Sequence, residues 1–294
     1  MSEQDTGWVG LGAMGWPMAG HLHSEGHLKA VWNRTMSKSA AFAEQHPDTI
    51  AATTLGTLAE RCQVITLCVS ADEDLEAVVD EMLPALEPGK ILVDHSTVSP
   101  ATARSIAAKL AEHEIGFIDA PVTGGVEGAV KGQLAIMAGG NWDTFQAVQS
   151  RLSAYARVTH HLGHAGSGQA AKAVNQLMVS GIAEAVCEAL ALMDKLDLPR
   201  EHMLELLSGG AANSWFLEKR GRTMLADEFE VGFAPNLLLK DLEICRALCE
   251  EADFESSVIK QAIADYTTLI DNGDTGKDIS ALIRLKRELT GPAG

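Results

Sequence analysis

The first residues whose types and spacing point to chemistry are three glycines near the start of the sequence. Gly10, Gly12 and Gly15 form the pattern G-x-G-x-x-G, between an apolar strand and a helix that the sequence predicts. In this pattern the first glycine allows a tight turn, the second lets backbone N–H groups approach a pyrophosphate, and the third lets helix and strand pack closely. The sequence therefore predicts a dinucleotide-binding turn, with Leu11 and Met14 as further cofactor contacts.

The end of the second predicted strand indicates which dinucleotide binds. Sites for NAD usually place Asp or Glu there, to bind the 2′-hydroxyl of the ribose. This sequence has Asn33, Arg34 and Thr35 instead. A guanidinium can bind a 2′-phosphate through two hydrogen bonds, whereas a carboxylate would repel it. We therefore expect NADP(H) to be the preferred cofactor, with contacts from these three residues. The alternative is that Arg34 stacks on the adenine and that NAD(H) also serves.

The elements that must position these residues alternate between strand and helix up to about residue 163. Runs such as 63–69 are continuously apolar, as in parallel strands that are buried on both faces. We expect strands at 7–11, 28–33, 63–69, 89–96, 116–122, 133–139 and 156–162, and helices at 14–25, 37–46, 72–83 and 99–114. The pattern predicts an α/β Rossmann domain with a doubly wound sheet over residues 1–164.

The rest of the chain, residues 165–294, is predicted to be all-α. Helices are expected at 168–196, 200–208, 214–226, 235–251, 256–272 and 277–289. The first of these is apolar around much of its girth, which favours burial against a second subunit in a homodimer or homotetramer. No run of about 18 apolar residues indicates a membrane span. The first strand begins close to Met1, which leaves no room for a signal peptide, so we expect a cytoplasmic protein.

Charge and cysteine content narrow the classes of partner. The formal net charge is −17, which argues against binding nucleic acid or an anionic membrane surface but allows a small anionic substrate in a local cleft. The five cysteines form no C-x-x-C pair, so we expect free thiols in a reducing compartment. The histidines of HHLGH, at 160–164, have no fixed ligand geometry, and no metal site is predicted.

Four further stretches, together with GLGAMGWPMAGHL, match one family in order along the chain. They are DHSTVSP (94–100), DAPVTGGVEGAVKGQLAIMAGG (119–140), GSGQAAKAVNQL (166–177) and FAPNLLLKDLEIC (233–245). With these motifs the chain resembles the β-hydroxyacid dehydrogenases, which include 3-hydroxyisobutyrate dehydrogenase, tartronate semialdehyde reductase and the glyoxylate/succinic semialdehyde reductases. The resemblance implies a Rossmann domain followed by a helical domain like that of 6-phosphogluconate dehydrogenase.

The resemblance also implies roles for individual residues. Lys172 matches the catalytic lysine of the family, and Gln176 follows the substrate-binding asparagine where Asn or Gln is usual. The implied substrate-binding residues are Ser96, Thr123, Gly124, Gly125, Asn175, Phe233 and Asp241. The implied cofactor contacts beyond the first two strands are Val69, Thr97 and Lys240. Two alternatives stay open: Asp241 as the partner in a salt bridge, and Phe233 as a core residue.

The chemistry of these residue types agrees with the implied roles. Hydride transfer to a carbonyl produces an alkoxide, which a positioned lysine ammonium can stabilise and protonate. Lys172 and Asn175 are three residues apart and share one face of the predicted helix. In a Thr-Gly-Gly turn the glycines let backbone N–H groups approach a carboxylate.

The leading hypothesis is an NADPH-dependent reductase of a small aldehyde acid such as glyoxylate or succinic semialdehyde. The product would be the corresponding hydroxy acid, with hydride from the nicotinamide and a proton from Lys172. The alternative within the class is a 3-hydroxyisobutyrate or tartronate semialdehyde dehydrogenase or reductase. The alternative from another class is a non-catalytic dinucleotide-binding module, against which the presence of Lys172, Asn175 and Lys240 argues.

Overall fold

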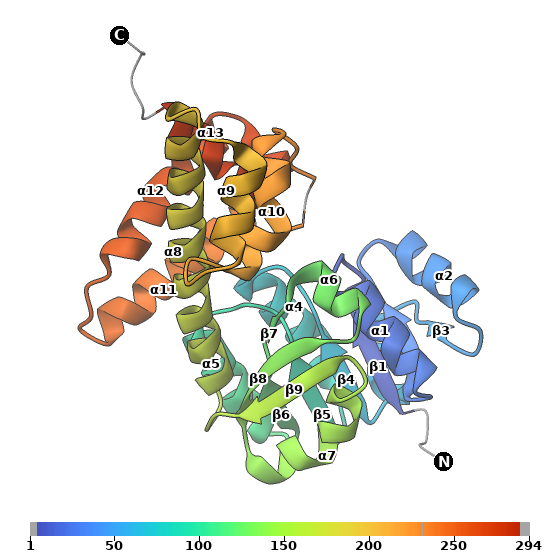
Figure 1. The fold of residues 1–294 in the computed structure, drawn as a ribbon. Helices are drawn as coiled ribbons and strands as arrows, with labels where there is room; N and C mark the ends of the chain where they lie inside the picture. The colour runs from blue at the N-terminus through green and yellow to red at the C-terminus, as the bar shows by residue number, and fades with distance from the viewer. Residues whose placement is uncertain (1–4, 231, 289–294) are drawn as a thin grey trace. The chain divides into compact units, whose positions relative to one another are not determined.

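The computed structural model describes residues 5–230 and 232–288. The chain divides into two compact units, Met1–Lys172 and Ala173–Gly294. The first unit, blue to yellow-green in Figure 1, contains the strands, and the second unit, yellow to red, is helical in the part described. The predicted combination of an α/β Rossmann domain and an all-α domain is confirmed.

The first unit is built on a nine-stranded sheet. The strand order is β3-β2-β1-β4-β5-β6-β8-β7, and β9 pairs with β8. The strands from β3 to β6 are parallel to their neighbours, so the helices that follow β1 and β4 begin at the same edge of the sheet. The strands are β1 (Thr6–Val9), β2 (Leu28–Trp32), β3 (Ile50–Ala51), β4 (Val64–Leu67), β5 (Ile91–Asp94), β6 (Gly116–Asp119), β7 (Val122–Thr123), β8 (Leu134–Gly140) and β9 (Ala156–His161).

Both faces of this sheet are covered by helices. Adjacent residues of β1 point to opposite faces, as strand geometry requires: Trp8 belongs to one hydrophobic cluster, with α1, α2 and α7, and Val9 to the other, with α3, α4 and α5. This two-sided burial explains the continuously apolar strands in the sequence. The helices are α1 (Gly15–Ser24), α2 (Met36–Gln45), α3 (Leu55–Arg61), α4 (Asp72–Met82), α5 (Pro100–Ala111), α6 (Gly125–Val130) and α7 (Trp142–Leu152), with the 3-10 helix η1 (Leu83–Ala85).

A single 29-residue helix, α8 (Ser167–Lys195), continues from the first unit into the second. In the part of the chain described, it is the one helix that is long and apolar enough to cross a membrane, but 44% of its most apolar window is buried, and core helices pass the same test. The other helices of the second unit pack around a shared apolar core. They are α9 (Arg200–Ser208), α10 (Trp215–Leu225), α11 (Pro235–Glu251), α12 (Ser257–Asp271), η2 (Asp274–Gly276), η3 (Ile279–Ala281) and α13 (Leu282–Glu288).

Several local predictions differ from the structure. The strand expected at 116–122 is interrupted, because the chain leaves β6 after Asp119 and resumes as β7, which runs antiparallel to β8. The last predicted helix starts as the 3-10 turn η3, so α13 begins at Leu282. The helices α3, α6 and α7 were not predicted, although Thr54 and Asn141 cap the first turns of α3 and α7 with their side-chain oxygens.

Candidate active site

The glycine turn has the backbone geometry that a pyrophosphate site requires. Gly10 has a φ of +97°, and a Cβ there would collide with the carbonyl oxygen of Cys68. A Cβ on Gly15 would collide with the carbonyl oxygen of Gly10, so both positions need glycine. At Gly12, by contrast, a Cβ would meet no described atom within 4 Å. The turn therefore leaves open space at Gly12, beside the start of α1, where a pyrophosphate fits.

Asn33 stabilises this turn from the end of β2. Its Oδ1 accepts a hydrogen bond from Leu11 N at 2.9 Å, and its Nδ2 donates to Thr35 O at 3.2 Å. The side-chain amide therefore connects the glycine turn to the turn after β2. The next residue, Arg34, extends into solvent with an 83% exposed side chain. Of the predicted residues here, Asn33 shapes the backbone and Arg34 is accessible to a ligand.

The segment after β5 is fixed by a glutamine that sequence reasoning missed. Gln169 lies in the first turn of α8; its Oε1 accepts from Val98 N at 3.2 Å and its Nε2 donates to Ser96 O at 2.8 Å. The hydroxyl of Ser96 accepts from Val69 N at 2.9 Å. The predicted residues Ser96 and Val69 are thus brought together, and Thr97 lies between the two positions that Gln169 binds. The polar Gln169 within an Ala-rich motif was the signal that could have identified it.

Asp119 supports the start of α8 in a similar way, and it was also missed. Its Oδ1 accepts from Gly166 N at 2.8 Å and its Oδ2 accepts from Gln169 N at 2.9 Å. Burial raises the pKa of this carboxyl group to about 6, although the backbone N–H groups act in the opposite direction. Asp119 therefore connects the end of β6 to the helix that carries Lys172.

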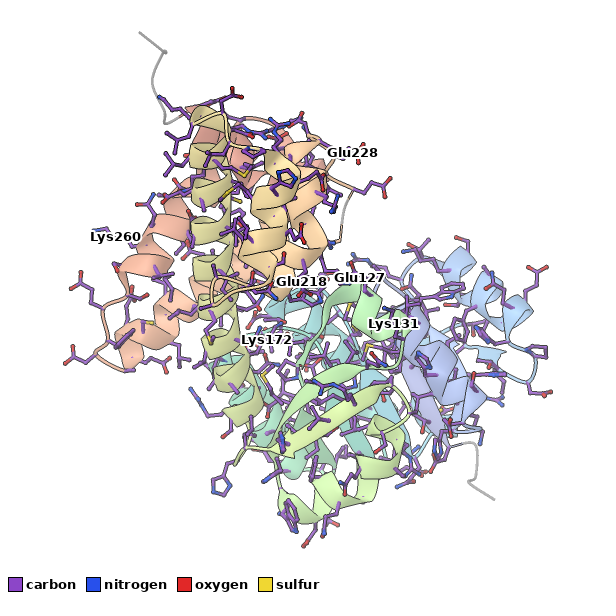
Figure 2. The ribbon with its side chains drawn as sticks, viewed as in Figure 1. Glu127, Lys131, Lys172, Glu218, Glu228 and Lys260 are labelled. Carbon is purple, nitrogen blue, oxygen red and sulfur yellow. The ribbon has the colours of Figure 1, made fainter. Side chains whose placement is uncertain are left out.

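Lys172 lies against the predicted substrate loop. Its Nζ donates to Val122 O at 2.9 Å, and Val122 immediately precedes Thr123. Figure 2 shows Lys172 on α8, Glu127 on α6, which begins within the loop, and Lys131 directly after the end of α6. The two loop glycines, Gly124 and Gly125, have φ values of +132° and +66° and are exposed. The structure thus places the lysine beside the Thr-Gly-Gly turn, as the predicted roles require.

In the second unit, four polar residues form one chain of contacts. Asn175 Nδ2 donates to Gln176 Oε1 at 2.9 Å, and Gln176 Nε2 donates to Asp241 Oδ2 at 2.8 Å. Asp241 Oδ1 lies 3.2 Å from Lys240 Nζ. The structure therefore brings Asn175, Lys240 and Asp241 together through Gln176. Asp241 is buried and contacts Gln176 as well as Lys240. Its role is therefore not limited to a salt bridge at the surface.

Phe233 is positioned through its backbone. Its N–H donates to Asp278 Oδ2 at 3.0 Å, and its carbonyl oxygen accepts from Ile279 N at 2.9 Å. Its ring is partly buried against the apolar core of the second unit. Part of the ring therefore packs in the core, in agreement with the alternative that Phe233 is a core residue.

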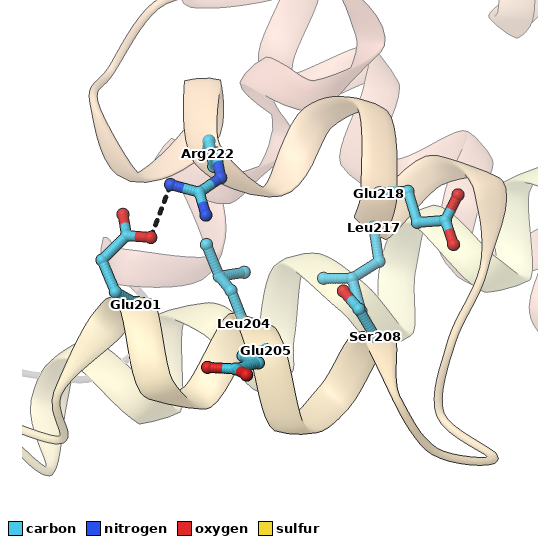
Figure 3. Close-up of a pocket in the computed structure, with 7 residues that line it drawn as sticks. All are labelled: Glu201, Leu204, Glu205, Ser208, Leu217, Glu218 and Arg222. Atoms are coloured by element: carbon cyan, nitrogen blue, oxygen red, sulfur yellow. Dashed lines mark ion pairs between the residues drawn. The ribbon is translucent and has the colours of Figure 1, made fainter.

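Other features of the described residues lie apart from the predicted site. Figure 3 shows a groove between α9 and α10, in which Leu204 and Leu217 face each other and Glu201 pairs with Arg222. None of the predicted site residues lines this groove. His161 Nε2 donates a hydrogen bond to Gly140 O at 2.8 Å, and its ring packs on the aromatic rings of Trp142 and Phe145. Within residues 5–230 and 232–288, no cluster of three or more His, Cys, Asp or Glu side chains could hold a metal ion.

Comparison with known proteins places both units in one family. Residues 5–163 match the NAD binding domain of 6-phosphogluconate dehydrogenase, and residues 166–286 match the family described as NAD-binding of NADP-dependent 3-hydroxyisobutyrate dehydrogenase. An oxidoreductase of Shewanella frigidimarina is 40% identical over 81% of this chain and 82% of its own length. The 2-(hydroxymethyl)glutarate dehydrogenase of Eubacterium barkeri is 32% identical over 97% of this chain and 95% of its own.

A solved structure agrees with these sequence matches. The 3-hydroxyisobutyrate dehydrogenase of Mycobacterium tuberculosis, solved with L-serine, is 26% identical, covers 97% of this chain and 99% of its own, and superposes with a TM-score of 0.86. Fold and sequence together define an oxidoreductase that uses a nicotinamide dinucleotide. More specifically, the chain belongs to the 3-hydroxyisobutyrate dehydrogenase family of NAD(P)-dependent hydroxyacid dehydrogenases. The resemblance seen in the sequence motifs is confirmed.

Proposed function

We propose that this enzyme reduces a small aldehyde acid, such as glyoxylate or succinic semialdehyde, to the hydroxy acid with NADPH. The observation that carries the proposal is the hydrogen bond from Lys172 Nζ to Val122 O. It holds a proton donor beside the Thr-Gly-Gly turn, whose backbone N–H groups suit a carboxylate. A substrate that carries both a carboxylate and a carbonyl matches this pairing of groups.

Lys172 has the chemical role of an acid in this proposal. The hydrogen bond from Nζ to Val122 O fixes the position of the ammonium group, which is the proton donor in this proposal. As hydride arrives at the carbonyl carbon, negative charge develops on that oxygen, and the ammonium stabilises this charge and transfers a proton to it. The nicotinamide supplies the hydride when it is bound. Ser96, Thr123, Asn175, Phe233 and Asp241 are the proposed substrate-side residues.

The cofactor preference rests on the turn after β2. Asn33 is engaged with Leu11 N, and the neighbouring Arg34 is an accessible cation whose guanidinium suits a 2′-phosphate. We therefore propose that NADP(H) is preferred and that NAD(H) is the weaker alternative. Gly10, Gly12, Gly15 and Met14 would hold the pyrophosphate, and Val69, Thr97 and Lys240 would be further contacts.

The second candidate function is oxidation of 3-hydroxyisobutyrate or reduction of tartronate semialdehyde. The names of two relatives favour it, since both 3-hydroxyisobutyrate and 2-(hydroxymethyl)glutarate carry a primary alcohol next to the carbon that bears a carboxylate. The same lysine and the same loop would serve these substrates. In the oxidative direction Lys172 would accept the proton of the alcohol.

The proposal extends to organisation and location. We assign residues 1–164 to an NADP-binding domain, which also supplies Ser96 and Thr123 for the substrate, and residues 165–294 to a substrate and dimerisation domain, which also supplies Lys240 for the cofactor. Val174, Met178 and Leu192 are exposed apolar side chains on α8, which supports a homodimer or homotetramer. All five cysteines are free thiols, which supports a cytoplasmic location. A light-scattering measurement that gives the mass of a monomer at assay concentrations would refute the oligomer.

A steady-state assay tests the function directly. NADPH and NADH are each combined with glyoxylate, succinic semialdehyde, tartronate semialdehyde and methylmalonate semialdehyde, and cofactor oxidation is followed. Turnover with NADPH on glyoxylate or succinic semialdehyde supports the first proposal. Turnover confined to the other two aldehydes supports the second candidate. No turnover on any of the four, with NADPH still bound, would contradict both.

The role of Lys172 is tested by Lys172→Ala. We expect kcat to fall by about 10³-fold or more, because the variant lacks the proton donor and the charge that stabilises the alkoxide. The dissociation constant of NADPH should change little. Lys131→Ala is the matched control, because Lys131 is an exposed lysine of the same unit at the end of α6, and its kcat should match the wild type. Retained turnover in Lys172→Ala would refute the role.

A further inference from the structure

An acidic side chain on α4 contacts the arginine that the proposed function assigns to the 2′-phosphate. Arg34 Nη1 lies 3.0 Å from Asp74 Oδ1. Asp74 belongs to the acidic first turn of α4, together with Asp72 and Glu73. Asp72 accepts a hydrogen bond from Ser99 N, so two carboxylates of this turn have specific partners rather than only solvent.

The topology of the sheet explains why these two residues meet. Strands β2 and β4 both pair in parallel with β1, one on each side. Their carboxyl ends therefore lie at the edge of the sheet where the glycine turn begins. Arg34 follows β2, and Asp74 follows β4 at the start of the next helix. The ion pair thus lies at the edge where a Rossmann sheet holds its dinucleotide.

We propose that Asp74 is a specificity-determining residue that limits the preference for NADPH over NADH. The proposal rests on the proposed contact between Arg34 and the 2′-phosphate. A 2′-phosphate must share the guanidinium with the carboxylate of Asp74 and approach a charge of its own sign. The 2′-hydroxyl of NADH carries no charge and meets neither obstacle. Asp74 therefore weakens the binding of NADPH and leaves the binding of NADH unchanged.

The exposure of the pair sets the size of the effect. The side chain of Arg34 is 83% exposed and that of Asp74 is 33% exposed. The interaction free energy of an exposed ion pair is small, because water and salt screen the two charges. A free energy of this size changes an equilibrium constant by roughly two- to fivefold. Asp74 thus reduces the selectivity of the site without reversing it.

The experiment measures the binding of NADPH and NADH to the full-length enzyme and its Asp74→Asn variant by calorimetry. We expect the Kd of NADPH to fall roughly two- to fivefold in Asp74→Asn, with the Kd of NADH unchanged. The difference should shrink as salt is raised, because the interaction is between exposed charges. Asp80→Asn is the matched control. Asp80 lies on the same helix and pairs with Lys109 at 2.6 Å, so this substitution removes the same charge at a position that does not pair with Arg34. It should leave both values of Kd unchanged.

Arg34→Ala and the double variant separate this inference from the proposed function. If Arg34→Ala loses more affinity for NADPH than for NADH, the contact between Arg34 and the 2′-phosphate is supported. If the two losses are equal, both this contact and the Asp74 inference are overturned. If Arg34→Ala is selective but Asp74→Asn leaves the Kd of NADPH unchanged or raises it, only the Asp74 inference is overturned. In the double variant the gain from Asp74→Asn should disappear. A gain that persists would show that Asp74 does not act through Arg34.

Discussion

Two buried glutamines, seven residues apart on α8, support the two units in different ways. Gln169 is 1% exposed and belongs to the first unit, and Gln176 is 2% exposed and belongs to the second. Gln169 binds backbone groups, the N–H of Val98 and the carbonyl of Ser96. Gln176 binds side chains, those of Asn175 and Asp241. The same residue type therefore fixes a loop in one unit and a group of side chains in the other.

This difference indicates which parts of the site can adjust to a substitution. A backbone group that loses its partner in the interior cannot turn toward water without moving the chain. A side chain that loses one partner can change rotamer or keep a second partner, as Asp241 keeps Lys240. We therefore expect the first unit to depend more strongly on its buried polar residues.

The largest effect is expected from Gln169→Leu. The volume is similar, but Val98 N and Ser96 O lose their buried partner, so the free energy of unfolding should fall by about 4 kcal/mol. The segment with Ser96 and Thr97 also loses its anchor, so kcat should fall in parallel. Chemical denaturation followed by tryptophan fluorescence measures the first effect. A loss below about 1 kcal/mol would mean that the loop holds its shape without Gln169.

The second prediction concerns His95, another buried residue of the first unit that binds the backbone. Its Nδ1 contacts Ala120 O at 2.6 Å, its Nε2 contacts Tyr155 Oη at 2.7 Å, and its ring stacks on Trp8. Burial lowers the pKa of His95 to about 4. Between pH 6.5 and 4 the unfolded chain binds a proton that the folded chain does not, so stability is lost as the pH falls, by about 3 kcal/mol at pH 4.

The measurement compares unfolding free energies of the wild type and His95→Asn across this pH range. Asp119 has a raised pKa of about 6, so its contribution to stability is present at low pH and lost as the pH rises from about 4 to 6. The two groups oppose each other, and only the difference in slope between wild type and variant isolates His95. Parallel curves would show that His95 does not titrate differently in the folded state.

The sequence predicted the elements whose patterns are local. The Gly10–Gly15 turn, the buried parallel strands and the long helix α8 all follow from periodicity, glycine spacing and end signals. The family motifs identified Lys172 and the Thr123 loop as candidate site residues, because both lie in long matching stretches, and the structure shows that Lys172 Nζ donates to Val122 O. The partners of Gln169 and Asp119 are backbone groups, which residue types do not reveal, so the sequence could mark Gln169 only as a polar residue in an Ala-rich motif. The Arg34–Asp74 pair was missed since it joins two turns forty residues apart, and only the strand order brings them together.

The smallest effect is expected from Gln176→Leu, the counterpart of Gln169→Leu on the same helix. Asp241 loses one hydrogen bond but keeps Lys240, so the free energy of unfolding should fall by only about 1–2 kcal/mol. Asn175 and Lys240 lose the residue that connects them, so kcat/KM should fall by about tenfold while the fold is kept. The ratio of catalytic to stability loss should therefore be larger than in Gln169→Leu. If both variants lose the same free energy of unfolding, the distinction between backbone and side-chain partners is wrong, because both replacements remove one buried amide with two hydrogen bonds.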